Sequence, residues 1–169
     1  QMVALTTDQV VTLSTDQAAA LTTAQLAAFT TAQLVTMEVD DFAAITTAQI
    51  TALKTAQIAS LTTAQVVALT TAQVANLTTA QLSAFTTAQL VTMETEDIAA
   101  ITTEQITSLT TAHVSALTSD QVLALTTGQL ATLKTAQVVA LTTDNLATIT
   151  TAQISAFTTA QIASLTTAQ

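Results

Sequence analysis

Large hydrophobic residues recur along this chain at alternating intervals of five and three residues, with no insertion or deletion from end to end. We label the eight positions of the repeat a to h, with Leu61 at a and Ala68 at h. Position a is Leu, Ile, Phe or Met at all 21 of its occurrences, and position f is Val, Ile, Leu or Phe in every full repeat except at Ala18. The pattern predicts one continuous array of about 21 octads over residues 1–169, a one-dimensional stack rather than a globule.

The spacing favours short α-helices. A straight strand would point positions a and f to opposite faces, because they are separated by odd numbers of residues. A β-solenoid would also need corner residues such as Gly or Pro, and the chain has one Gly and no Pro. In one continuous helix, each octad would rotate the apolar stripe by about 80°. We therefore predict an all-α solenoid with one very short helix per octad. A β-solenoid or β-rich fibril is the alternative, because Thr, Val and Ile are abundant and charge is low.

The helix starts can be located from a second pattern. Position b is Thr or Ser in 17 of 21 octads, and position e is Gln in 17 of 21. Thr-x-x-Gln is a capping box, and the large residues at a and f form the matching hydrophobic staple. The boxes predict helices over positions c to h. Lys54 and Lys134 occupy position b without a hydroxyl, whereas position c is Thr or Ser in 20 of 21 octads, so the cap could lie at c in some repeats.

Packing between the helices is predicted from the small residues at g and h, which would let successive helices approach closely. Isolated helices of fewer than about 12 residues are marginal in water, so stability must come from neighbouring helices and a column of Leu, Ile and Val. Residues 29–50 nearly repeat as residues 85–106, seven octads further on. This echo indicates an ancestral duplication.

Charge excludes several functions. Eleven acidic residues face two lysines and no arginine, for a net charge of −9, whereas nucleic-acid and anionic-membrane surfaces require clustered basic residues. No apolar run reaches the roughly 18 residues of a membrane span, so we predict neither nucleic-acid binding nor membrane insertion. All eleven acids fall at positions b, d or e, in the first helical turn, where the helix dipole favours negative charge.

Candidate sites are few. The acidic clusters at residues 38–41 and 94–97 could supply carboxylates to calcium, although helix capping already explains them. His113 replaces the Gln of position e and is interpreted as a capping substitute, and the sequon at Asn76 as a chance match. With no Cys, Trp, Tyr or Arg and one His, the sequence predicts no enzymatic activity. It also predicts no catalytic, cofactor-binding or metal-binding residue and no cofactor.

The octad core Leu-Thr-Thr-Ala-Gln, as at residues 61–65, resembles the octapeptide arrays of large, repetitive, secreted or adhesin-like bacterial proteins. The resemblance covers the whole chain and implies a bacterial, extracellular location. Because the chain opens and closes at position e, we expect a segment of a longer array.

Together these features favour a structural role: an extracellular filament or stalk whose partner is itself, through end-to-end association, with lateral association as a further mode. The surface is expected to be rich in Thr, Gln and Ala. The alternative function is a binding module, either an adhesin repeat or an ice-binding face built from the rows of Thr.

Overall fold

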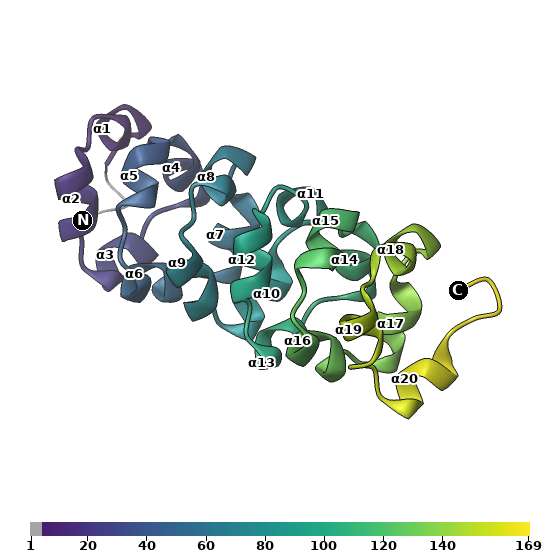
Figure 1. Cartoon of the computed structure of the whole chain (residues 1–169). Helices are drawn as coiled ribbons and strands as arrows, with labels where there is room; N and C mark the ends of the chain where they lie inside the picture. The colour runs from purple at the N-terminus through teal and green to yellow at the C-terminus, as the bar shows by residue number, and fades with distance from the viewer. Residues whose placement is uncertain (1–4) are drawn as a thin grey trace.

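The computed structural model describes residues 5–169. They form an elongated rod of short helices, with the first helices of the chain at one end and the last helices at the other (Figure 1). Within these residues there are twenty α-helices of four to six residues and no strand, which confirms the helical prediction. The helices are α1 Thr7–Val11, α2 Thr15–Ala20, α3 Thr23–Ala27, α4 Thr31–Thr36, α5 Val39–Ala43, α6 Thr47–Ala52, α7 Thr55–Ser60, α8 Thr63–Val67, α9 Thr71–Asn76, α10 Thr79–Ala84, α11 Thr87–Leu90, α12 Thr95–Ala100, α13 Thr103–Ile106, α14 Thr111–Ala116, α15 Ser119–Ala124, α16 Thr127–Thr132, α17 Thr135–Ala140, α18 Thr143–Thr148, α19 Thr151–Ile154 and α20 Thr159–Ser164.

Each helix begins at position c, with position b as its N-cap. In α8, the backbone N–H of Gln65 donates to the Thr62 hydroxyl at 3.1 Å, and the Thr62 N–H donates to Gln65 Oε1 at 3.1 Å. Lys54 and Lys134 are also N-caps, so the alternative cap at position c is wrong. At Lys54 the box keeps one half, because the Lys54 N–H still donates to Gln57 Oε1 at 2.8 Å.

The helices are broken without glycine or proline. Residues at positions a and b adopt extended conformations, such as Leu61 at φ −54°, ψ 141° and Thr62 at φ −71°, ψ 156°. No residue from 5 to 169 has a positive φ. Ordinary side chains are therefore tolerated at every break.

The predicted apolar column is the core of the rod. From Leu26 to Val138, every side chain at position f is at most 1% exposed, and those at position a from Phe29 to Leu141 are 2–5% exposed. The staple residues therefore serve mainly as the continuous core of the solenoid.

The chain winds into a superhelix in which each helix packs on the helix three further along. Every close helix pair follows this rule, for example α4 with α7 and α7 with α10. The small residues at g and h thus do not bring successive helices together as predicted; contacts form between turns. In Figure 1, α1, α8 and α15 lie along one edge of the rod and α6, α13 and α20 along the other. Seven octads therefore complete two turns, and the seven-octad echo in the sequence is a repeat of two turns.

Candidate functional site: a ladder of buried amides

The Gln side chain at position e has a second role that sequence reasoning missed. From Gln33 onward these side chains are buried, at 1–5% exposed, except at the terminal Gln169. The expectation of a Gln-rich surface is therefore wrong: the surface is mainly Thr and Ala, and the Gln amides lie between turns. The sequence contains one signal of this second role. A capping box accepts Glu as readily as Gln and the helix dipole favours Glu, yet no octad has Glu at e.

Gln81 shows the arrangement in full. Its Oε1 accepts from the Thr78 backbone N–H at 2.9 Å, which closes the capping box. Its Nε2 donates to the carbonyls of Ile50 and Leu53, each at 2.8 Å, and makes a longer contact of 3.2 Å with the Thr51 carbonyl. One amide thus fixes the start of its own helix and binds the end of a helix in the preceding turn. It satisfies the Leu53 carbonyl and adds a second hydrogen bond to the Ile50 carbonyl, which also accepts from the Leu53 backbone N–H at 3.2 Å.

The same hydrogen bond repeats through the rod. In each case Nε2 donates to a carbonyl at position a one turn earlier, three and a half octads back along the chain, at 2.5–3.0 Å. We call this series of bonds the amide ladder; its Gln rungs are Gln33, Gln49, Gln57, Gln65, Gln73, Gln81, Gln89, Gln105, Gln121, Gln129, Gln137, Gln153, Gln161 and Gln169.

Two substitutions at position e preserve the ladder. His113 Nδ1 accepts from the Thr110 N–H at 3.3 Å, and the ring also hydrogen-bonds the Phe85 backbone, one turn earlier. Asn145 keeps the rung to the Leu117 carbonyl at 3.1 Å, although its shorter side chain does not close the capping box. Imidazole thus reproduces the acceptor and donor of the amide, which extends the predicted capping role of His113.

Burial lowers the pKa of His113 below its ordinary value of 6.5, because the folded chain favours the neutral ring. A His with a lowered folded pKa loses its stabilising contribution as pH falls through 6.5 towards that pKa. We therefore expect His113→Gln to stabilise the chain, with a gain that grows as the solution is acidified from neutral pH. Thermal unfolding at several pH values measures the difference; a gain independent of pH would contradict the assignment.

Asp41 and Asp97 break the ladder. They occupy position e in α5 and α12, are 4% and 2% exposed, and each has an Oδ2 atom that is buried without a hydrogen-bond partner. An ionised carboxylate has no hydrogen to donate to the carbonyl of the preceding turn. Burial, together with neighbouring carboxylates, raises the pKa of Asp41, and that of Asp97 from 3.8 to about 6. The interpretation of all eleven acids as favourable helix-start charges is therefore wrong for these two.

The rest of both acidic clusters is exposed. Glu38 and Glu94 are N-caps without a side-chain cap hydrogen bond, and Asp40 and Glu96 lie in the first turns of their helices. Within residues 5–169, no group of three or more His, Cys, Asp or Glu side chains is arranged to hold a metal ion. An open depression of about 400 Å³ lies beside Thr78, Glu104 and Gln105, and Glu104 is the one acidic side chain that lines it. No helix in the described part is long and apolar enough to cross a membrane.

The two ends of the ladder differ. Gln9, Gln17 and Gln25 belong to the first described turn, so their amides make only capping-box bonds. At the other end, the carbonyls of Ile149, Phe157 and Leu165 lie where the rungs of one further turn would reach. Ile154 and Ile162, at position f, are 40% and 44% exposed there. One end of the rod thus presents amide donors, and the other presents carbonyls and uncovered apolar side chains.

Comparison with known proteins gives a repeat signature. A family model described as the ALTTAQ repeat matches residues 1–31, 34–71 and 90–127, which is more than half of the chain. No curated protein and no solved structure matches it.

Proposed function

Because the chain belongs to the ALTTAQ repeat family, we propose that it is a structural, non-enzymatic element of an extracellular filament or stalk. In this proposal, the solenoid is extended by further turns stacked head to tail, whether these turns belong to the same chain or to a second copy. The complementarity of its two ends carries the proposal.

Three amide donors at one end match three carbonyl acceptors at the other in number and spacing. Gln9, Gln17 and Gln25 are separated by one octad each, as are the three carbonyls at the far end. Inside the rod, each turn also covers the f side chains of the turn before it, which reduces their exposure to near zero. A following turn would bury Ile154 and Ile162 in the same way and contribute about 25 cal/mol for each Å² of apolar surface covered.

The surface chemistry supports an exposed structural role. Lys54 and Lys134 are the only basic residues, and the chain has four Phe as its only aromatic residues, all of them at apolar core positions, so cleavage sites for proteases with trypsin-like or chymotrypsin-like specificity are few. The single histidine uses its ring in the ladder and is unsuited to serve as a free general base.

End-to-end stacking predicts which surface substitutions block assembly. We expect Ile162→Asp to weaken association by about 2 kcal/mol, or about thirtyfold, because stacking would bury an unpaired carboxylate. Val67→Asp is the control, because Val67 is also 44% exposed but lies on the side of the rod. Sedimentation velocity over a concentration series measures both. A wild-type chain that stays monomeric at high concentration, or equal effects of the two substitutions, would contradict end-to-end stacking.

The second candidate is a binding surface. Exposed Thr residues at positions b and c, such as Thr62 and Thr63, recur in most octads along the rod. Such rows fit an ice-binding or adhesin-type face. Thermal hysteresis separates the two functions: a clear depression of the freezing point would favour the binding module over the filament.

A further inference from the structure

Exposed apolar side chains gather on one side of the rod. Within residues 5–169, seven large hydrophobic side chains are exposed, and four of them are separated by whole turns: Val11, Val39, Val67 and Leu123. Because one turn takes three and a half octads, these four lie along one line parallel to the rod axis. Val39 is also the single residue at position c that is neither Thr nor Ser. The line is therefore a feature of this sequence and not of the octad.

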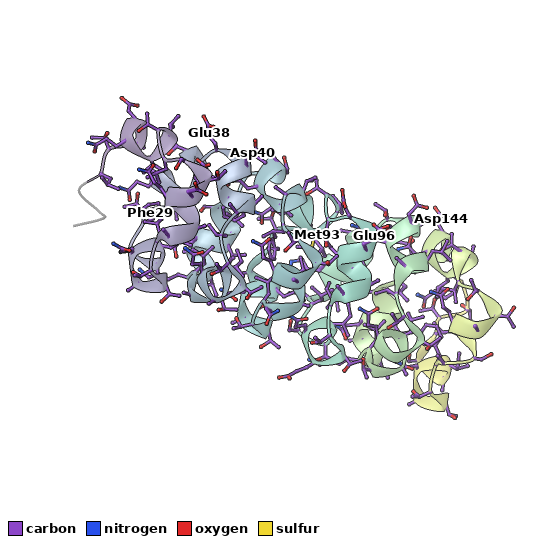
Figure 2. The ribbon with its side chains drawn as sticks, turned by 60° about the vertical axis from the view of Figure 1, so that its left-hand side comes forward. Phe29, Glu38, Asp40, Met93, Glu96 and Asp144 are labelled. Carbon is purple, nitrogen blue, oxygen red and sulfur yellow. The ribbon has the colours of Figure 1, made fainter. Side chains whose placement is uncertain are left out.

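Exposed carboxylates flank the same line. Asp8 and Asp120 precede Val11 and Leu123 by three residues, and Glu38 and Asp40 adjoin Val39. In the turn where Thr95 occupies the line, Glu94 and Glu96 adjoin it. Figure 2 shows Glu38, Asp40 and Glu96 along one edge of the rod. We call these four apolar and six acidic residues the acidic-apolar stripe.

Basic residues lie on the other side. Lys54 follows Val39 by 15 residues, about half a turn, and Lys134 follows Leu123 by 11 residues, about two-fifths of a turn. No Lys or Arg of the described chain therefore lies on the stripe, and its acids are not neutralised by neighbours. A stripe that is apolar along its centre and negative along its margins attracts a partner with the opposite charges around an apolar centre.

Several partners are disfavoured by charge. Nucleic acids and anionic membranes would be repelled by six carboxylates. A second copy docking stripe to stripe would bring like charges together, and two lysines on the opposite side are too few to match the stripe.

We propose that the acidic-apolar stripe docks a cationic amphipathic polypeptide segment, in which Lys or Arg side chains flank a row of apolar ones. The apolar row would lie over Val39, Val67 and Leu123, and the basic side chains would pair with the flanking carboxylates. This interaction uses the side of the rod and leaves both ends open, so it is independent of end-to-end stacking.

A matched pair of double variants tests the proposal. V67T/E96A changes the stripe, whereas V139T/E104A makes the same two changes elsewhere. Val67 and Val139 occupy the same position in two octads that share the sequence Thr-Ala-Gln-Val-Val-Ala, and are 44% and 39% exposed, but Val139 lies about half a turn away from the stripe. Glu96 and Glu104 are both at position d, one octad apart. Ala is common at position d in other octads, and Thr occurs at position g at Thr51 and Thr107, so both variants introduce residues that the repeat already accepts.

The probe is a fluorescein-labelled synthetic peptide of Lys and Leu in amphipathic helical order, with a peptide in which Ser replaces every Leu as the equally charged control. Binding is followed by fluorescence anisotropy at physiological ionic strength, with sedimentation velocity recording any self-association. We expect the Lys-Leu peptide to bind and the Lys-Ser peptide to bind at least severalfold more weakly. V67T/E96A should weaken binding about five- to tenfold, because it removes one partly buried Val and one exposed ion pair. V139T/E104A should weaken binding by less than about twofold.

Three results would overturn the proposal. Equal weakening by the two variants would show diffuse attraction to net charge, and equal binding of the two peptides would exclude an apolar contact. Absence of binding to the Lys-Leu peptide, with the chain folded by circular dichroism, would show that the stripe does not dock such segments.

Discussion

Gln81→Glu is expected to destabilise the solenoid by about 3 kcal/mol, although it replaces one amide nitrogen by one oxygen. The carboxylate can still accept from the Thr78 N–H, so the capping box remains. It loses the Nε2 hydrogen bonds to the preceding turn and places a negative charge against the carbonyls of Ile50 and Leu53, each 2.8 Å from the original nitrogen. The cost is therefore that of an unpaired buried charge rather than that of a lost cap.

The control for this substitution is Gln9→Glu. Gln9 is exposed and makes the same capping box with Thr6, but it has no preceding described turn to bind. We expect a change within about 0.5 kcal/mol there. Repeat arrays can unfold in parts. The effect is therefore measured both by thermal unfolding and by native-state hydrogen exchange of the backbone amides near Gln81. Equal destabilisation at the two sites would show that capping, and not the ladder, determines stability.

The stability of the chain is expected to include a contribution from Asp97 that increases as pH falls. Its folded pKa of about 6 lies above the ordinary value of 3.8, so the folded chain binds the proton more tightly than the unfolded chain. The contribution is fully present below pH 3.8 and is lost as pH rises through about 6. A shift of this size corresponds to roughly 3 kcal/mol. The protonated carboxyl can also donate a hydrogen bond, as the Gln amides do in other turns.

Asp97→Gln isolates this contribution. The substitution restores the repeat residue, so we expect it to stabilise the chain by a few kcal/mol at about pH 7, by the same linkage, and by much less at about pH 4. Denaturant unfolding of both proteins at each pH gives the difference, in which the titration of His113 and of the acids outside residues 94–97 cancels. A difference that does not change between the two pH values would contradict the raised pKa.

The elements of the fold could be predicted from the sequence because each signal was local. The capping box at Thr62 to Gln65 and the staple at Leu61 and Val66 lie within six residues, so they define the helix without knowledge of its neighbours. The number of octads per turn could not be predicted in this way. It depends on a hydrogen bond between residues a full turn apart, and any small residue at g or h is compatible with several windings.

The ladder was missed for a related reason. Capping is sufficient to explain Gln at position e, and the contact with the preceding turn is not local in sequence. The complete absence of Glu at this position is its one trace in the sequence. Asp41 and Asp97 are likewise ambiguous in sequence. An acid in the first turn of a helix is ordinarily exposed and favourable, and only the packing of the preceding turn shows that these two are buried.

The winding of the solenoid depends on interior Gln side chains that donate hydrogen bonds to the previous turn. The most direct measurement is hydrogen exchange of assigned Gln side-chain amides by ¹⁵N nuclear magnetic resonance. The ladder predicts slow exchange for the interior rungs from Gln57 to Gln137 and fast exchange for Gln9, Gln17 and Gln25, although all of them share the same capping box. Uniformly fast exchange along the chain would contradict the ladder and, with it, the winding of seven octads into two turns.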